Sequence, residues 1–363
     1  MINKKFWKKK NILITGHTGF KGGWLSVLLN LLESNIYGYA LSPIGRNNFF
    51  NSVKIKKIFK KDFRNDISNL EYLKKCIKSS KAEIIFHLAA QSSVVESFKN
   101  SNNTVLTNIM GTSNILEAAK DLKSVKCVII VTTDKVYQNY KTKKYFTENS
   151  VLGGDDVYSG SKACCEILAH SYNKSFFSNT TCNIATVRAG NCFGGGDWTK
   201  DRIVKDSLES FSRNKNLTLR SPEANRPWQH VIEPLTGYLI LAEKLFSKKG
   251  KKYVGAWNFG PSTKQNMKVL DLAKLIKQTI NSKSKITIKK KDKRFHTKKF
   301  KVFESKYLNI DSRKAFKKLR WKPRLSIKNS VKLTVEWHKG FLQKKNLLEL
   351  TSKQIKKYIT KNL

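Results

Sequence analysis

The sequence has no hydrophobic run long enough to cross a membrane. Its longest apolar stretches, such as Ile84–Phe86 and Val128–Val131, are far shorter than the roughly 20 residues of a membrane-spanning helix. The N-terminus is basic, but a glycine-rich segment soon interrupts the apolar stretch after it, which is not typical of a signal peptide. We therefore expect no membrane partner.

Cysteine is scarce, and the six cysteines show no Cys-x-x-Cys spacing. This pattern favours reduced, buried thiols in a cytoplasmic enzyme and predicts neither a disulfide framework nor a metal site. His87 and His230 have no second ligand at metal spacing, so we expect both to be core or supporting residues. The cysteines are Cys76, Cys127, Cys164, Cys165, Cys182 and Cys192.

Acidic residues are also few: 26 Asp and Glu face 71 Lys and Arg, and the formal net charge is +45. Such an excess is typical of proteins that bind nucleic acid or an anionic membrane surface. It also arises from compositional drift, because Lys, Asn, Ile, Phe and Tyr are abundant together and all have AT-rich codons. The lysines are spread along the whole chain, with one dense segment at 281–301. We favour drift and expect no nucleic-acid partner, although the field should attract anionic substrates.

A glycine-rich turn near the N-terminus predicts a phosphate-binding site. An apolar strand, Asn11–Thr15, leads into glycines spaced G-x-x-G-x-x-G, and an amphipathic helix over 24–33 follows. Strand, glycine turn and helix N-terminus together hold a pyrophosphate against free backbone N–H groups. The candidate cofactor-binding residues here are Gly16, Thr18, Gly19, Phe20, Lys21 and Gly22.

The ends of the next strands offer further cofactor contacts. A strand over 36–41 ends without the carboxylate that would bind an NAD ribose, and Arg46 close behind could accept a 2′-phosphate, so NAD and NADP stay open. Asp62 follows a third short strand, where it could reach an adenine or be an ordinary loop or cap residue. A fourth strand over 83–88 leads to a segment whose small residues would let a cofactor approach closely. Its candidates are Ala89, Ala90 and Gln91.

Two polar motifs carry the predicted chemistry. Thr132-Thr133-Asp134-Lys135 ends an apolar strand, so its side chains should emerge at the carboxyl edge of a sheet, where ligands bind in open α/β folds. Tyr158 and Lys162 lie four residues apart on one face of a helix. Because an opposite charge stabilises the ionised form, the lysine should favour a tyrosinate base.

Strand-like and helical segments alternate throughout, which predicts an α/β fold with a doubly wound parallel sheet. We expect residues 1–190 to form a dinucleotide-binding domain, with 231–260 returning to it. A smaller C-terminal substrate-binding lobe would contain 191–230 and 261–363, with a final helix over 326–341.

Taken together, these segments resemble the extended short-chain dehydrogenase/reductase family, which has a Rossmann-type sheet, and its NAD-dependent epimerases and dehydratases. Within it they look most like the CDP-glucose 4,6-dehydratases. The matching motifs span positions 16 to about 260, with weaker likeness to the end. They are the glycine turn, His87-Leu-Ala-Ala-Gln91, Thr132-Thr-Asp-Lys135, Tyr158-Ser-Gly-Ser-Lys162, Gly194-Gly-Gly-Asp-Trp198 and Arg226-Pro-Trp-Gln-His230.

The resemblance implies a lyase that converts CDP-D-glucose to CDP-4-dehydro-6-deoxy-D-glucose on one NAD, for deoxysugar biosynthesis of surface polysaccharides such as O-antigen. Tyr158, with Lys162 and Thr133, would take the sugar 4-hydroxyl proton as hydride leaves C4. Asp134 is the natural acid for the departing 6-hydroxyl. Lys135 replaces a glutamate of related dTDP-glucose dehydratases. It would remove the C5 proton, which requires a lowered pKa, or stabilise the C4 enolate.

The resemblance also implies nucleotide-sugar contacts in the later segments. Arg226 is the best candidate for the diphosphate, since a guanidinium matches phosphate oxygens in bidentate fashion. Asn191 could bind the same phosphates and Arg220 is a weaker second cation, while salt-bridge roles stay open for both arginines. Trp198 and Trp228 could stack on the base or pack in the core. The predicted substrate residues are Asn191, Asp197, Trp198, Arg220 and Arg226.

Two rival functions remain at this point. One is another nucleotide-sugar 4,6-dehydratase or 4-epimerase of the same family. The other, of a different class, is a nucleic-acid-binding protein on a decayed dehydrogenase scaffold, which the charge suggests. Relatives form dimers or tetramers through their long helices, so the resemblance also implies a homo-oligomer.

Overall fold

The structure is a computed structural model. It describes residues 2–45, 47–139, 144–262, 266–288 and 308–360, together with the backbone of two short strands between 296 and 301. Arg46 and residues 289–295, 298 and 299 of the lysine-rich segment lie outside the described residues. Within them, no helix combines the length and the apolar character needed to cross a membrane.

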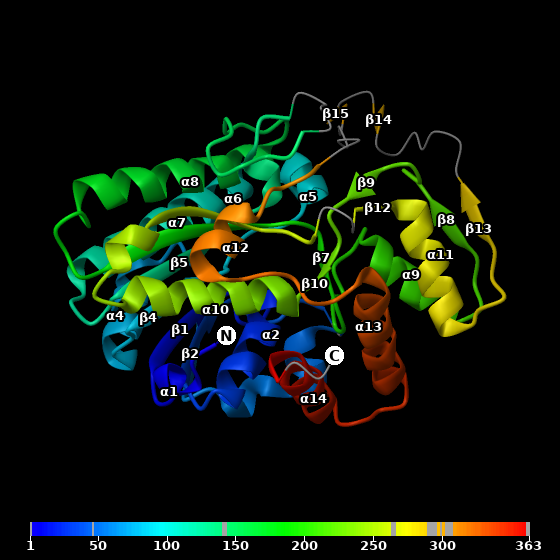
Figure 1. The fold of residues 1–363 in the computed structure, drawn as a ribbon, viewed down its shortest axis with the longest axis horizontal. Helices are drawn as coiled ribbons and strands as arrows, with labels where there is room; N and C mark the ends of the chain where they lie inside the picture. The colour runs from blue at the N-terminus through cyan, green and yellow to red at the C-terminus, as the bar shows by residue number, and fades with distance from the viewer. Residues whose placement is uncertain are drawn as a thin grey trace.

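Seven parallel strands form the central sheet, in the order β11-β6-β5-β4-β1-β2-β3 (Figure 1). This order confirms the predicted doubly wound parallel sheet. The direction of winding reverses between β1 and β4, which is where open α/β sheets bind their ligands. The strands are β1 Asn11–Thr15, β2 Asn35–Ala40, β3 Lys61–Arg64, β4 Ile84–His87, β5 Cys127–Val131, β6 Asn183–Ala189 and β11 Gly255–Phe259.

Helices cover both faces of the sheet (Figure 1). In β1, Leu13 faces a core shared with α4 (Leu70–Ser80), α7 (Gly111–Asp121) and α8 (Val157–Ser175). Its neighbours Ile12 and Ile14 face the opposite core, shared with α2 (Phe20–Leu31) and α10 (Ile232–Phe246). This alternation is why the buried strands are apolar at nearly every position.

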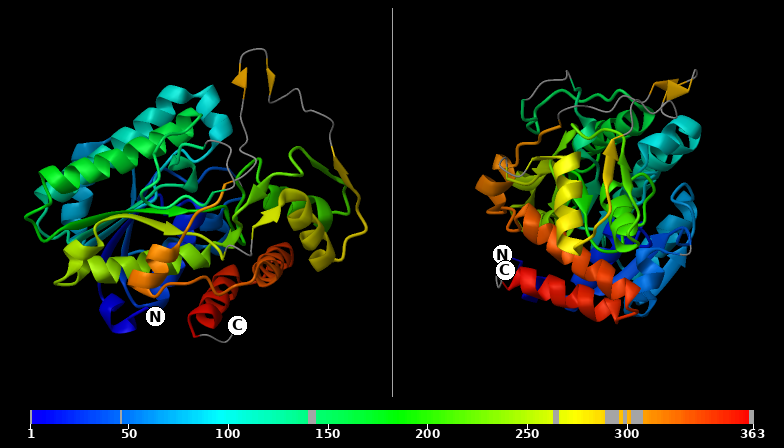
Figure 2. Two further views of the ribbon diagram at one scale, coloured as in Figure 1. Left: turned by 45° about the horizontal axis from the view of Figure 1, so that its top comes forward. Right: turned by 90° about the vertical axis from the view of Figure 1, so that its right-hand side faces the viewer.

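A smaller group of elements lies beyond the carboxyl ends of the strands (Figures 1 and 2). Helices α9 (Ile203–Ser212) and α11 (Val269–Ile280) pack together there, and β8 (Leu217–Leu219) pairs with β13 (Ile286–Ile288). These elements have their own apolar cluster, which includes Phe211 and Leu272. The proposed boundaries between the two lobes remain a prediction.

Two expectations about helices were wrong. Helix α2 begins at Phe20, several residues before the expected start, because Gly22 and Gly23 are accommodated inside it. The helix expected to be last, α13 (Ile327–Leu342), is followed by α14 (Leu347–Ile359), whose apolar stripe is diluted by lysines. Helix α14 packs against α2.

The remaining elements are short. They are α1 Lys4–Trp7, α3 Phe49–Val53, α5 Val94–Lys99, α6 Ser101–Val105, α12 Arg313–Leu319, β7 Cys192–Phe193, β9 Asn225–Arg226, β10 Gln229–His230, β12 Met267–Lys268, β14 His296–Thr297, β15 Phe300–Lys301, the 3₁₀ turns η1 Ile55–Ile58, η3 Asp134–Val136 and η4 Gly250–Tyr253, and the π-helical turn η2 Leu106–Met110.

Candidate functional site

The glycine turn lies where the winding of the sheet reverses. Gly16 has a φ of +72°, and a Cβ there would lie 2.7 Å from the backbone nitrogen of Ala89. A Cβ on Gly22 would lie 2.3 Å from the carbonyl oxygen of Gly16, so only glycine fits either position. Gly19 is the N-cap of α2, and no side chain in the described part of the chain caps it. The first N–H groups of this 12-residue helix can therefore bind an anion.

The other predicted cofactor residues surround this turn. The Thr18 hydroxyl donates to the carbonyl oxygen of Leu41, at the end of β2, over 3.2 Å. Ala89 and Ala90 are partly exposed beyond the end of β4. The Gln91 side chain donates to Thr104 Oγ1 over 2.8 Å, so its amide is held by the protein itself.

Asp62 was expected after the third strand but lies within β3. Its carboxylate is 2.8 Å from His17 Nε2 and 2.6 Å from Arg64 Nη2. Burial raises its pKa, but these two partners outweigh burial and the pKa is lowered. The acidic residue just past the carboxyl end of β3 is Asp66, which the sequence analysis did not single out. Its Oδ1 accepts the backbone N–H of Ser68.

The two motifs predicted to be catalytic meet at the carboxyl end of β5. Tyr158 and Lys162 lie near the start of α8, which Asp156 caps by accepting the Ser159 N–H over 2.9 Å. The Lys162 ammonium donates to the carbonyl oxygen of Val131, the last residue of β5, over 3.1 Å. Both α8 residues are therefore held beside the Thr132–Lys135 segment.

Tyr158 does not show the expected preference for the tyrosinate. Burial raises the pKa of its phenol to about 12, although a hydrogen bond with Thr133 and the charge of Arg202 act in the opposite direction. Lys162 is itself buried, and burial is the main cause that lowers its pKa. The expectation was wrong because desolvation of the phenol, which depends on tertiary packing, exceeds the local charge effect.

Asp134 is a buried carboxyl with a raised pKa. It is 3% exposed, and its Oδ1 accepts the Thr133 hydroxyl over 3.1 Å. No partner for its Oδ2 is found among the described residues. Burial raises its pKa, and the opposing effects of its neighbours, among them Lys135 and Arg226, do not outweigh burial. Such a carboxyl can keep a proton and donate it, as a general acid must. Lys135 is partly exposed on η3.

Asn108 joins the cofactor and catalytic sides, and sequence reasoning missed it. It is fully buried on the π-helical turn η2. Its side chain accepts the Gln91 N–H over 2.9 Å, donates to the Gln91 carbonyl oxygen over 3.1 Å, and donates to Ser161 Oγ over 2.9 Å. A π turn is frequently found at functional sites. The sequence around Asn108 contains no motif that singles it out.

The predicted substrate residues separate into two groups. Arg226 is 4% exposed on β9, and its charge acts on Asp134. The carbonyl oxygen of Asn191 accepts the Gln229 N–H over 3.1 Å, which holds the loop after β6 beside β10. Arg220, by contrast, is exposed and forms an ion pair with Asp201 at 2.9 Å.

The two tryptophans pack within the protein. Trp198 lies against Phe341 of α13, with ring centroids 4.7 Å apart. Its neighbour Asp197 accepts the Thr199 N–H over 3.1 Å. Trp228 is buried and donates from Nε1 to the Met267 carbonyl oxygen.

The segment over 194–198 is also joined to the cofactor turn. Trp24 of α2 donates from Nε1 to the carbonyl oxygen of Gly195 over 2.9 Å. A Cβ on Gly195 would lie 2.0 Å from the Trp337 ring, so the segment is packed between two tryptophans.

His87 and His230 are both buried, and burial lowers the pKa of each to about 3. His87 Nδ1 lies 2.8 Å from Thr15 Oγ1, and the His230 ring packs edge-on against Trp24. Across the described ranges, no cluster of three or more His, Cys, Asp or Glu side chains could hold a metal ion.

The raised pKa of Asp134 predicts a pH-dependent loss of stability. Above the ordinary aspartate pKa of 3.8, the unfolded chain releases this proton while the folded chain keeps it. The free energy of unfolding therefore falls by about 1.4 kcal/mol for each pH unit between the unfolded and the folded pKa. Asp134→Asn removes this dependence, so its Tm relative to the unmodified protein should increase as the pH is raised from about 4 towards neutrality.

The matched control is Asp155→Asn at an exposed position. Thermal unfolding followed by circular dichroism would measure both variants. A Tm difference for Asp134→Asn that stays constant across the range would show that the buried carboxyl is not protonated in the folded state.

Comparisons with known proteins place this geometry in context. A family model described as GDP-mannose 4,6 dehydratase matches residues 13–334. A CDP-glucose 4,6-dehydratase of Salmonella typhimurium is 36% identical over 365 residues, which cover 99% of this chain and 99% of that protein.

Solved structures share the fold at lower identity. A UDP-glucose 4-epimerase of Thermotoga maritima with UDP-glucose superposes with a TM-score of 0.77 at 21% identity, covering 92% of this chain and 99% of that one. A dTDP-glucose 4,6-dehydratase of Bacillus anthracis in complex with NAD gives a TM-score of 0.74 at 22% identity, covering 93% and 99%. These likenesses agree with the sheet order described above.

Proposed function

The chain belongs to the GDP-mannose 4,6-dehydratase family, and we propose that it converts CDP-D-glucose to CDP-4-dehydro-6-deoxy-D-glucose. The full-length similarity to the Salmonella enzyme supports this substrate. The observation that carries the proposal is the meeting of a buried, proton-retaining carboxyl, Asp134, with Tyr158 and Lys162 at one sheet edge. An elimination coupled to alcohol oxidation requires an acid and a redox pair in this proximity.

The proposed cofactor is NAD, held at its pyrophosphate by the first N–H groups of α2. The glycine turn fits this cofactor because neither Gly16 nor Gly22 has a Cβ, which would fill the space within the turn. When bound, NAD would supply the hydride acceptor for C4 and the hydride donor for C6. Arg64 donates to the carbonyl oxygen of Leu41 over 3.0 Å, so a cation rather than a carboxylate lies at the end of β2. This arrangement keeps NADP as the alternative cofactor.

Tyr158 is the proposed base for the sugar 4-hydroxyl. Because burial holds it as a phenol, it needs positive charge nearby to release its proton. Arg202 acts in that direction, and Lys162 is the second cation, one turn along α8. Thr133, hydrogen-bonded to Tyr158, would orient the same hydroxyl.

Asp134 and Lys135 are the proposed elimination pair. Asp134 would donate the proton that it retains to the departing 6-hydroxyl, which leaves as water. Lys135 would take the C5 proton or stabilise the enolate that develops at C4. The two residues are adjacent on η3, so one short turn would serve both sides of the C5–C6 bond.

Substrate recognition is assigned to the segments after β6. Arg226 is the proposed diphosphate ligand because its guanidinium is buried close to Asp134. Asn191 is the proposed second phosphate contact. Arg220 remains a weaker second cation for the diphosphate, Trp198 remains a candidate for stacking on the base, and Asp197 remains a candidate substrate residue. The contacts of Trp198 and Arg220 favour structural roles.

Incubation with CDP-glucose tests the proposed function directly. We expect formation of a 4-keto sugar, detected by its alkali-induced absorbance, with NAD identified by mass as the bound cofactor. Turnover of dTDP- or GDP-glucose without turnover of CDP-glucose would instead favour another dehydratase of the family. Salt-sensitive DNA binding by protein that carries no nicotinamide would favour the nucleic-acid function.

Lys135→Met should block elimination while sparing oxidation at C4. We expect turnover to fall by about 10²–10⁴-fold, the usual contribution of a proton-transfer group, with reduced nicotinamide detected by absorbance. Lys174→Met, at an exposed position on α8, is the matched control. Full turnover by the Lys135 variant would exclude any role for this ammonium.

A homo-oligomer and a cytoplasmic location complete the proposal. Four large apolar side chains are exposed on α6, η2 and α8, which pack together and could bury them against a second copy. The six cysteines are all free thiols, as expected in a reducing compartment. Light scattering in solution should give a mass of two or four chains, and a mass of one chain would refute the proposed homo-oligomer. The exposed residues are Val105, Leu106, Met110 and Ile167.

A further inference from the structure

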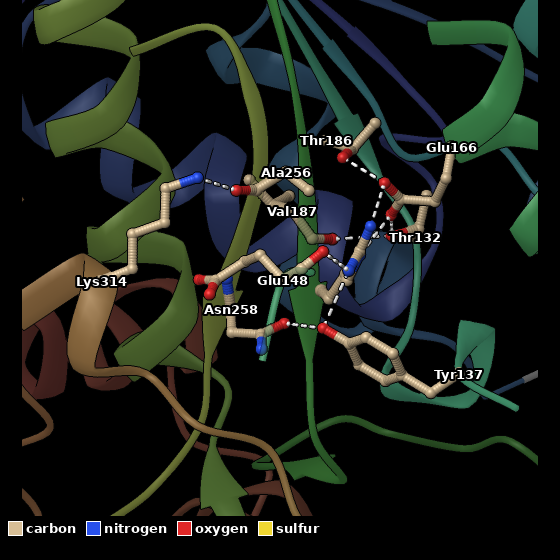
Figure 3. Close-up of polar contacts among 10 residues, drawn as sticks. Thr132, Tyr137, Glu148, Glu166, Thr186, Val187, Ala256, Asn258 and Lys314 are labelled. Carbon is tan, nitrogen blue, oxygen red and sulfur yellow. Dashed lines mark hydrogen bonds and ion pairs between the residues drawn. The ribbon is translucent and has the colours of Figure 1, made fainter. Parts of the chain in front are cut away.

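A buried ion pair lies beneath the catalytic edge of the sheet (Figure 3). Arg188 of β6 donates from Nε to Glu166 Oε1 over 3.0 Å and from Nη2 to Glu166 Oε2 over 2.9 Å. The side chains of both residues are 3% exposed. The Thr186 hydroxyl also donates to Glu166 Oε2. None of the motifs that predicted the function includes either charge.

The pair holds both ends of the segment that carries the proposed proton-transfer groups. At one end, the Thr132 hydroxyl donates to Glu166 Oε1 over 2.5 Å. At the other end, Arg188 Nη1 donates to the Tyr137 hydroxyl oxygen over 2.9 Å, and the guanidinium lies over the Tyr137 ring. Residues 133–135 lie between these two anchors.

The same pair fixes this segment to the redox helix and to the rest of the sheet. Glu166 lies one turn beyond Lys162 on α8, so its carboxylate joins that helix to β5 and β6. Tyr137 donates in turn to Asn258 Oδ1 of β11 over 2.6 Å (Figure 3). One guanidinium–carboxylate contact therefore acts with the bonds of Lys162 and Tyr158 to fix the position of α8 relative to the 132–137 segment.

A role in stability alone does not account for this arrangement. Two buried charges lose their hydration, and well-packed apolar side chains of similar volume usually replace such pairs without loss of stability. What apolar side chains cannot reproduce is directional hydrogen bonding to Thr132 and Tyr137. Glu166 already accepts from three side chains in four hydrogen bonds, so its carboxylate is committed to the protein.

We propose that Glu166 and Arg188 are positioning residues that set the distance between the elimination segment 133–135 and the redox pair Tyr158 and Lys162. This inference rests on the proposed function and adds a residue pair to it. Without the pair, Lys162 still contacts Val131 and Tyr158 still contacts Thr133. Thr132 and Tyr137, which flank residues 133–135, lose their hydrogen bonds to Glu166 and Arg188.

The expected consequence is uncoupling of the two halves of the reaction. With NAD bound, Tyr158 would take the 4-hydroxyl proton as hydride leaves C4 for the cofactor. If residues 133–135 are displaced, they would not remove the C5 proton and the 6-hydroxyl, so no C5=C6 double bond would form. C6 could then not receive the hydride taken from C4, as it would in the unmodified protein.

The test uses the double variant Glu166→Leu/Arg188→Met, because a single substitution would leave an unpaired buried charge and could prevent folding. We expect turnover of CDP-glucose to fall by about 100-fold, as a small misplacement of reacting groups can cause. We also expect persistent absorbance of reduced nicotinamide. Arg188→Lys keeps the charge but cannot contact both partners, so it should show a smaller uncoupling.

Glu233→Gln is the matched control. Glu233 is 1% exposed and accepts the N–H groups of Arg324 and Leu325, so it is a buried carboxyl group whose hydrogen bonds do not involve α8 or the 132–137 segment. If this variant loses activity, the loss should be proportional to its loss of folded protein. Reduced nicotinamide should not persist in it.

Hydrogen exchange of the cofactor-free protein, followed by mass spectrometry, gives a readout independent of activity. Peptides covering 132–137 should exchange faster in the double variant and not in Glu233→Gln. Normal turnover by the folded double variant, or a loss of turnover with neither persistent reduced nicotinamide nor faster exchange, would overturn the inference. If the unmodified protein makes no 4-keto sugar, the proposed function fails, and the exchange measurement still decides whether the pair anchors the segment.

Discussion

The hydroxyl of Thr15 makes the interaction on which the whole ligand edge depends. It accepts the N–H groups of Leu88 and Ala89 over 3.2 and 3.1 Å and lies 2.8 Å from His87 Nδ1. One side chain at the end of β1 thereby holds the chain leaving β4 against the glycine turn. The approach is so close that Gly16 has no room for a Cβ beside Ala89. Because parallel pairing continues from β4 to β5, the same register places the predicted catalytic segment at the same edge of the sheet as this turn.

Desolvation is the main electrostatic effect at this edge. It raises the pKa of Asp134 and of Tyr158 and lowers the pKa of Lys162 and of His87, and in every case it favours the neutral form. Neighbouring cations, among them Lys135 for Asp134 and Arg202 for Tyr158, act in the opposite direction on the two acids. The protonation states of these predicted catalytic groups therefore depend on a balance between local burial and cationic neighbours, and burial dominates.

Sequence reasoning predicted the sheet because its strands are apolar runs with glycine or polar residues directly after them. The turn at Gly16 and the pairing of Tyr158 with Lys162 were visible for the same reason, since their spacing is local. Asp66 was missed because the third strand was expected to end a few residues too early. Since β3 extends to Arg64, the acid that follows it is Asp66 and not Asp62.

Other features depend on tertiary packing that no local pattern encodes. The burial that holds Tyr158 as a phenol comes from elements distant in sequence, and so does the contact between Glu166 and Arg188. The position of Asn108 depends on a π-helical turn, and such a turn produces no characteristic spacing of apolar residues in the sequence. Helix α14 was missed because its core-facing residues are separated by lysines.

The hydrogen bond from Trp24 to Gly195 has a consequence for how such enzymes can diversify. The helix that begins at the glycine turn also supports the segment beside the proposed substrate, and Trp337 leaves that segment no space for a side chain at Gly195. A substrate lobe transferred by recombination from a relative would meet the wrong partner on α2 unless that helix came with it. Sugar specificity in this chain should therefore change by point substitutions that leave the contact between α2 and the 194–198 segment intact, and not by exchange of the whole lobe.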